Sequence, residues 1–105
     1  MDMRPLMKEI DVIKIEVLGS GEMIVQPDTS DTANFVFIYR AAAGVRWDEH
    51  RQVFVTPTPK KLSYGQWFQI TRDAVASELG VDLKVTDRTQ LINLPPTWSE
   101  TRRKQ

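Results

Sequence analysis

The chain has 105 residues and a mass of 12.1 kDa, and its 14 Lys and Arg side chains balance its 14 Asp and Glu side chains. This length fits one domain, and 41% hydrophobic with 27% charged residues are ordinary values for a folded protein. There is no cysteine, which excludes a disulfide framework, thiolate zinc sites and cysteine nucleophiles.

The composition also bears on partners and location. No stretch approaches the roughly 18–20 consecutive apolar residues of a membrane span, and the start of the chain lacks the apolar run of a signal peptide. We therefore expect a cytoplasmic protein with no membrane partner. Residues 57–105 carry eight basic and five acidic side chains, an excess too small to predict nucleic-acid binding.

The first predicted strands form a hairpin. Residues 1–9 carry no clear period and are expected to form a loose arm. After them Ile13, Ile15 and Val17 alternate with their neighbours, which is typical of a half-buried strand. A short glycine-containing turn and a second strand over residues 22–26 complete the hairpin.

Residues 35–40 give the strongest apolar run of the chain, and we predict that they form a central strand of the sheet. Phe35, Phe37 and Tyr39 would lie on one face, with apolar residues on the other face as well. A single helix can cover only one of these faces. We therefore expect a second copy of the chain to cover the other, which makes the protein a homo-oligomer, and specifically a dimer.

A second hairpin and a helix follow. Residues 45–47 and 53–55 flank a polar loop and predict two antiparallel strands. Residues 64–79 predict the main helix, with Ser63 as its N-cap, Gln66 completing a capping box, and Gly80 in the position that ends a helix. The helix is expected to supply its main core contacts through Trp67, Phe68, Thr71, Val75 and Leu79.

Residues 81–85 predict a further strand, residues 91–94 a short one, and residues 97–105 a polar, basic tail. Several strands before a lone helix favour an α+β fold. We predict one domain over residues 1–105, with an antiparallel, curved sheet of about five to seven strands packed on the helix 64–79.

The only histidine, His50, lies in the predicted loop beside Asp48 and Glu49. Such a group could hold a metal or orient an imidazole, but adjacent residues on a short loop rarely converge on one point. Asp73 and Glu78 on the helix are about 140° apart and do not face each other. No catalytic spacing stands out, and we expect no metal and no cofactor.

Aromatic residues cluster between the second hairpin and the helix. If they meet in space, they form either a plain aromatic core or the walls of a ligand cleft. A ligand site would combine aromatic walls with polar groups of the loop. The predicted site residues are Trp47, Tyr64, Trp67, Arg46, Glu49 and His50.

Between residues 39 and 94 the sequence resembles small bacterial proteins encoded on mobile integron gene cassettes. The residues that carry the resemblance are Tyr39-Arg40, Gly44–Asp48, Thr56-Pro57, Ser63–Trp67 and Glu78–Val81. The resemblance implies a bacterial cytoplasmic protein, often oligomeric, and it transfers no functional residue.

Two classes of function remain open. The first is a small binding or interaction protein that forms a homo-oligomer and has an aromatic-lined cleft for a small molecule or a protein partner. The second is a small cofactor-free enzyme that uses Glu49, His50 or Asp73 in a cleft lined by Trp47 and Trp67. The absence of catalytic spacing favours the first class.

Overall fold

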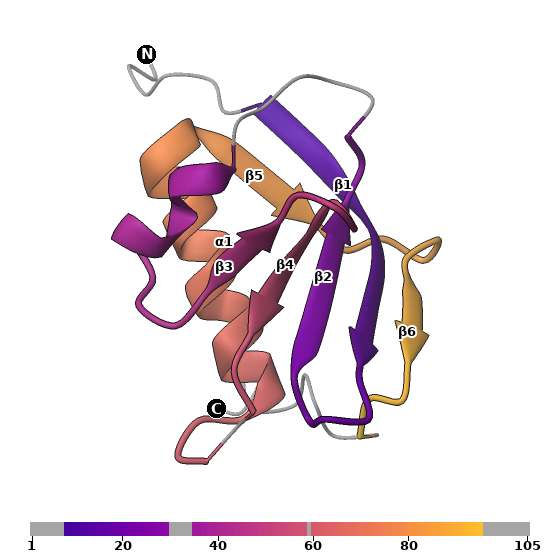
Figure 1. Ribbon diagram of the computed structural model, residues 1–105. Helices are drawn as coiled ribbons and strands as arrows, with labels where there is room; N and C mark the ends of the chain where they lie inside the picture. Colours follow the sequence, from indigo (N-terminus) through magenta and orange to yellow (C-terminus); the bar gives the residue numbers. More distant parts are fainter. Residues whose placement is uncertain (1–7, 30–34, 59, 96–105) are drawn as a thin grey trace, which may run out of the picture.

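The computed structural model describes residues 8–29, 35–58 and 60–95. The predicted tail at 97–105 and most of the predicted arm lie outside these ranges. In chain order the elements are β1 (Lys8–Val17), β2 (Met23–Pro27), the 3₁₀ helix η1 (Val36–Arg40), β3 (Arg46–Asp48), β4 (Val53–Thr56), α1 (Tyr64–Leu79), β5 (Val81–Lys84) and β6 (Gln90–Ile92) (Figure 1).

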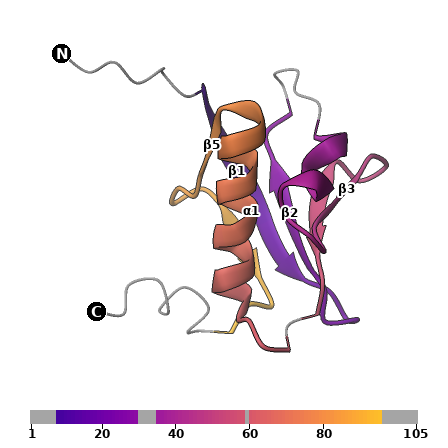
Figure 2. The ribbon, with the colours of Figure 1, turned by 90° about the vertical axis from the view of Figure 1, so that its left-hand side faces the viewer.

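The described strands form one open sheet with α1 along one face (Figure 2). The strand order is β3-β4-β2-β1-β5, and β6 also pairs with β1. The prediction of an α+β fold with one main helix on a largely antiparallel sheet is confirmed. The sheet is nevertheless mixed, since β5 and β6 run parallel to β1. The reason for β5 is that α1 carries the chain back across the sheet after β4, so that β5 runs in the same direction as β4 and therefore as β1.

The boundaries of α1 agree with the sequence prediction. The Ser63 hydroxyl accepts a hydrogen bond from the Gln66 amide at 3.1 Å, and the Gln66 side chain accepts one from the Ser63 amide at 2.8 Å. At the other end, Gly80 takes the left-handed conformation (φ 66°) that closes a helix. These signals are local in sequence, which explains why the prediction located both ends.

The buried face of α1 differs in part from the predicted one. Phe68, Thr71 and Val75 are buried as expected. Trp67 is only half-buried, and Leu79 is 38% exposed. The prediction of Leu79 as a core residue is wrong because Leu79, at the end of α1, lines an open hollow between α1 and η1.

A β-bulge in β1 changes which of its side chains are buried. The pairing with β2 shifts register between Val12 and Lys14, and Ile13 is 41% exposed. Val12 and Ile15 are both buried although they are three residues apart. The expected placement of Ile13 on the same face as Ile15 is therefore wrong, since a bulge breaks the alternation of faces.

Residues 35–40 do not form the central strand that the sequence predicts. Val36–Arg40 form the 3₁₀ helix η1, which closes the core beside the edge strand β3. Phe35 and Ile38 are each only 2% exposed, and they are three residues apart. A 3₁₀ helix has three residues per turn, so this spacing puts one face inward and leaves two faces outward. A strand would instead have buried alternate residues.

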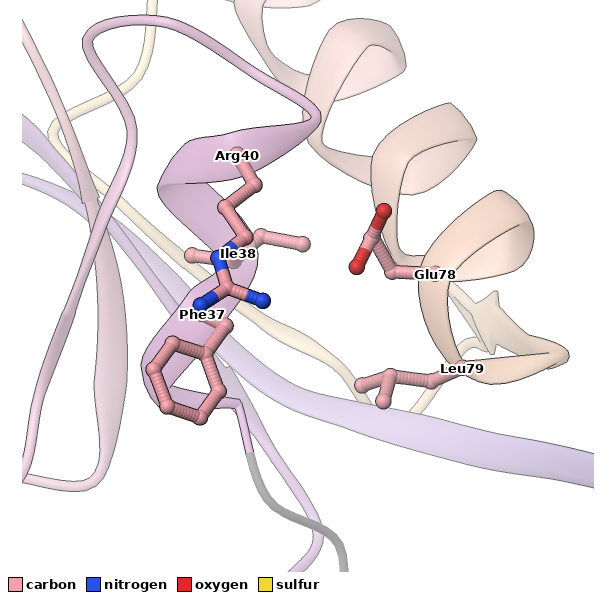
Figure 3. Close-up of a pocket in the computed structure, with 5 residues that line it drawn as sticks. All are labelled: Phe37, Ile38, Arg40, Glu78 and Leu79. Carbon is pink, nitrogen blue, oxygen red and sulfur yellow. The ribbon is translucent and has the colours of Figure 1, made fainter.

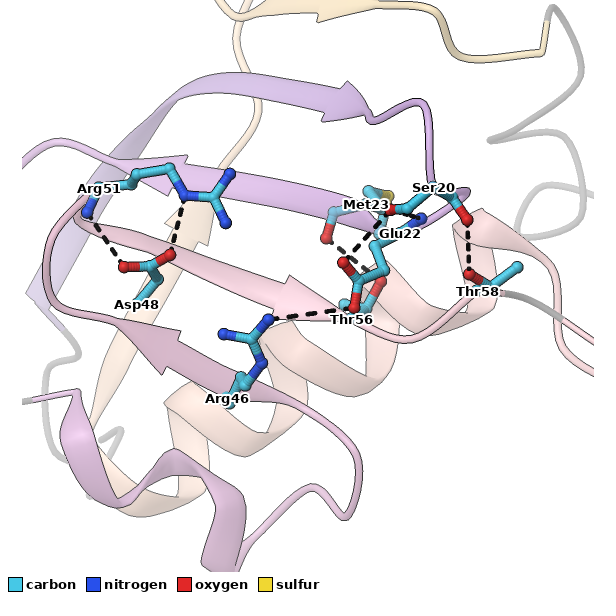
Figure 4. Close-up of polar contacts among 8 residues, drawn as sticks. All are labelled: Ser20, Glu22, Met23, Arg46, Asp48, Arg51, Thr56 and Thr58. Carbon is cyan, nitrogen blue, oxygen red and sulfur yellow. Dashed lines mark hydrogen bonds and ion pairs between the residues drawn. The ribbon is translucent and has the colours of Figure 1, made fainter.

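The sheet face opposite α1 carries a small apolar cluster of its own. Ile24, Val53 and Val55 are at most 4% exposed. Charged side chains surround this cluster, because Glu16 pairs in register with Ile24, and Arg46 with Val55. Because residues 35–40 are not a strand of the sheet, the reason for expecting a second copy on this face no longer holds. An ion pair on this face joins Lys14 to Glu16. Two more, on and beside the face, join Arg46 to Glu22 and Arg51 to Asp48 (Figure 4).

Candidate functional site

The predicted ligand-site residues come from β3, the hairpin tip after it and the first turn of α1 (Figure 1). Glu49 and His50 lie in the tip, beyond Asp48, which pairs with the first residue of β4. Arg46 lies at the other end of β3, opposite Val55 and beside Glu22, near the end of β4 that leads to α1. Trp47 lies between them on β3, and Tyr64 and Trp67 lie in the first turn of α1.

The hairpin tip is organised by the Asp48 carboxylate. It accepts hydrogen bonds from the backbone amides of His50 at 3.0 Å and Arg51 at 3.2 Å. It also accepts one from Arg51 Nε at 2.8 Å. Gln52 adopts φ 60°, and its side chain donates to the Glu49 carbonyl at 2.8 Å. The polar groups near His50 thus hold the turn together, and the tip remains on the surface.

These contacts predict an acid-sensitive hairpin tip. The side chain of Arg51, and then its backbone amide, lower the pKa of Asp48 below the ordinary aspartate value. A lowered pKa in the folded state stabilises the protein above the pKa of the unfolded chain, and this stabilisation is lost as the pH falls through the folded-state pKa. We expect an NMR titration to place Asp48 below an aspartate in a peptide. The substitution Arg51→Gln should raise the pKa of Asp48 towards the ordinary aspartate value.

A matched variant separates this effect from general charge removal. Arg72 pairs with Asp82 at 3.2 Å, so Arg72→Gln should leave the Asp48 titration unchanged. An Asp48 pKa that does not respond to Arg51→Gln would contradict the assigned cause.

Trp47 belongs to a cluster of three aromatic rings. Its ring centroid lies 4.8 Å from that of Phe35 and 4.9 Å from that of Phe54, and the Phe35 and Phe54 centroids are also 4.9 Å apart. The indole Nε1 donates to Glu49 at 3.0 Å. Trp47 therefore fills the space between η1 and the sheet, with its polar atom already bonded.

Tyr64 and Trp67 have different surroundings at the start of α1. The Tyr64 hydroxyl donates to the Gly21 carbonyl at 2.8 Å and ties the helix to the β1–β2 turn. The Trp67 ring edge lies against Gly44, where an added Cβ would be 3.3 Å from Cη2. Within the described ranges, the Trp67 indole N–H has no hydrogen-bond partner. Of the two tryptophans that the structure describes, Trp67 is therefore the one with a free donor.

Trp67 lines an open hollow of about 550 Å³ at the point where the chain leaves β4 and enters α1. Its lining is mainly apolar, with two lysines. We call it the Trp67 hollow; its lining residues are Pro57, Thr58, Lys60, Lys61, Leu62 and Trp67.

A second, smaller hollow of about 210 Å³ lies at the other end of α1, against η1 (Figure 3). Arg40 and Glu78 flank it from η1 and α1, and the guanidinium of Arg40 lies 4.3 Å from the centroid of the Phe37 ring. The hollow is lined by Phe37, Ile38, Arg40, Glu78 and Leu79.

The candidate acid–base residues are not gathered into a centre. Asp73 accepts a hydrogen bond from Gln69 at 2.9 Å on the surface of α1. In residues 8–29, 35–58 and 60–95, no group of three or more His, Asp or Glu side chains could hold a metal ion. In the same part of the chain, no helix is long and apolar enough to cross a membrane. The prediction of a cofactor-free enzyme remains untested.

Comparisons with known proteins give the family. The family model described as Integron Cassette Protein Hfx_Cass5 matches residues 9–89. The chain belongs to this family. A solved structure, "Structure from the mobile metagenome of North West Arm Sewage Outfall: Integron Cassette Protein Hfx_Cass5", is 37% identical in sequence over 93% of this chain and 92% of that chain, with a TM-score of 0.44. Among curated proteins no match is found. The resemblance to integron cassette proteins is thus confirmed.

The sequence prediction missed the surface that the Hfx_Cass5 family member presents between η1 and α1. Phe37 and Arg40 were read as residues of a strand, and Leu79 as a residue of the core. One signal was available, since Phe35 and Ile38 lie three residues apart, the spacing of one face of a 3₁₀ helix.

Proposed function

We propose that this Hfx_Cass5 family protein is an interaction protein that acts as a homodimer, with the two copies meeting at the η1 end of α1. The observation that carries the proposal is a set of exposed apolar and oppositely charged side chains on the outward faces of η1 and the adjoining end of α1. We call it the η1–α1 patch, formed by Val36, Phe37, Tyr39, Arg40, Glu78 and Leu79.

The patch exposes four large apolar side chains. Val36 is 44% exposed, Phe37 43%, Tyr39 54% and Leu79 38%. The Phe37 and Tyr39 ring centroids are 6.4 Å apart, so the aromatic surface is continuous. Apolar side chains that gather in this way on a soluble protein commonly mark an interaction surface.

The charges of the patch favour a second copy over another occupant. Arg40 and Glu78 lie on opposite sides of the hollow, and in the described part of the chain they form no ion pair with each other or with other groups (Figure 3). In a two-fold dimer, every contact between a residue of one copy and a different residue of the other copy occurs a second time with the two copies exchanged. Arg40 of one copy then pairs with Glu78 of the other, and the same pair forms twice. A surface that carries both charges is complementary to itself.

Sedimentation velocity tests the proposal. At micromolar concentrations we expect a species of twice the 12.1 kDa chain mass. Arg40→Glu and Glu78→Arg should each weaken dimerisation roughly ten-fold, because each variant sets like charges against each other twice across the axis. The double variant Arg40→Glu with Glu78→Arg should restore dimerisation, since it exchanges the partners.

A control and two contrary outcomes complete the test. Leu91 on β6 is 50% exposed and lies outside the patch, so Leu91→Asp should leave the dimer intact. A wild-type chain that stays at 12.1 kDa would refute the homodimer. A dimer that both single reversals leave unchanged would refute the η1–α1 patch as its interface.

A further inference from the structure

The Trp67 hollow lies apart from the η1–α1 patch. Trp67 is in the first turn of α1 and Leu79 is its last residue, and a 16-residue helix is about 24 Å long. All residues that line the hollow belong to the described part of the chain. A ligand could therefore occupy the hollow in a monomer or a dimer, so an inference about it goes beyond the proposed function.

The walls of the hollow are apolar and already in place. The half-buried Trp67 ring is held at its edge, where Gly44 and Pro57 lie close to it. Pro57 and Leu62 add further apolar surface, and the proline ring is itself rigid. The volume of about 550 Å³ lies within the range of about 300–1,000 Å³ that is usual for small-molecule sites. A flat apolar group could therefore stack against Trp67 with little rearrangement.

The charged groups that line the hollow are both cations. Lys60 and Lys61 are exposed, and within the described ranges neither forms an ion pair. The unbonded indole N–H of Trp67 adds one more donor. The helix α1 starts next to the hollow, and the start of a helix carries a partial positive charge. Among the described residues that line the hollow, none is acidic. This combination attracts an anion and repels a cation.

We infer that the Trp67 hollow binds an amphipathic organic anion, a small molecule with a flat apolar body and one anionic group. The apolar body stacks against Trp67 and Pro57. The anionic group lies at the mouth of the hollow, where Lys60 and Lys61 neutralise it. Neither half of the ligand suffices, since a neutral ring lacks the ion pairs and inorganic phosphate lacks the stacking surface.

Binding of 2-naphthoate tests the inference by NMR. The indole N–H signal of Trp67 should shift on titration, with a dissociation constant on the order of 1 mM for so small a ligand. The indole signal of Trp47 is an internal reference, because its N–H is bonded to Glu49 and Trp47 is not among the residues that line the hollow. The neutral 2-naphthalenemethanol should bind at least roughly five-fold more weakly, and inorganic phosphate alone should not shift Trp67.

Variants assign the binding to its residues. Lys60→Gln with Lys61→Gln should weaken 2-naphthoate binding roughly ten-fold and leave 2-naphthalenemethanol unaffected. Arg88 is an exposed cation in the turn between β5 and β6, so Arg88→Gln is a matched control that should change nothing. The inference is overturned by a Trp67 signal that does not move, or by equal affinity for the neutral compound. It is also overturned if the lysine double variant binds like the wild type.

Discussion

Replacing Phe68 with alanine is expected to lower the free energy of unfolding by about 3–5 kcal/mol. The Phe68 side chain is fully buried on α1 and belongs to the core cluster that joins the helix to the sheet. Its removal leaves a cavity that the surrounding strands cannot fill. Because small domains are stable by only about 5–15 kcal/mol in total, this single change could leave much of the protein unfolded.

Urea unfolding followed by circular dichroism measures this loss. Leu91 is 50% exposed, so Leu91→Ala serves as a control and should change the free energy of unfolding by at most about 0.5 kcal/mol. If Phe68→Ala behaved like the control, α1 would not be packed on the sheet through Phe68.

Replacing Gly21 with alanine is expected to lower the free energy of unfolding by about 2–4 kcal/mol. Gly21 has a φ of +94°, which a residue with a side chain rarely adopts. An added Cβ would also lie 2.9 Å from Thr58 Cγ2. Thr58 cannot move away freely because its hydroxyl donates to the Ser20 carbonyl at 3.2 Å. The Gly21 carbonyl would in addition shift from the Tyr64 hydroxyl that it binds.

The neighbouring glycine gives a matched comparison. Gly19 is in the same turn, and an added Cβ there would have no heavy atom within 4 Å. Gly19→Ala should therefore leave the thermal unfolding midpoint unchanged or raise it slightly, since alanine restricts the unfolded chain. Equal loss in both variants would mean that the turn as a whole, rather than the conformation of Gly21, determines the stability.

The elements that could be predicted are those with local signals. Ser63, Gln66 and Gly80 specify the ends of α1 through contacts within a few residues, so the sequence locates the helix without knowledge of the sheet. The two hairpins likewise follow from a short turn between alternating strands. Residues 35–40 lack such a signal, and an apolar run of six residues is compatible with a strand or a helical turn.

The candidate sites depended on which residues the fold brings together. The sequence predicted that aromatic residues of the second hairpin and the helix would share one site, because they are close along the chain. The geometry instead directs Trp47 into a ring cluster with Phe35 and Phe54, and leaves Trp67 at an open hollow with Lys60. Closeness in sequence does not decide this, because Trp47 packs towards η1 whereas Trp67 packs beside Gly44.

The sequence by itself determined the fold class, the helix with both of its ends, the two hairpins and the resemblance to integron cassette proteins. The helix ends and the hairpins rest on interactions between residues near one another in the chain. Tertiary structure alone decided that β5 and β6 run parallel to β1, that a bulge exposes Ile13, and that Val36–Arg40 form a 3₁₀ helix. These features depend on which surfaces remain uncovered once the sheet and α1 have packed. Local propensity does not encode that outcome, because it is set by contacts between distant segments.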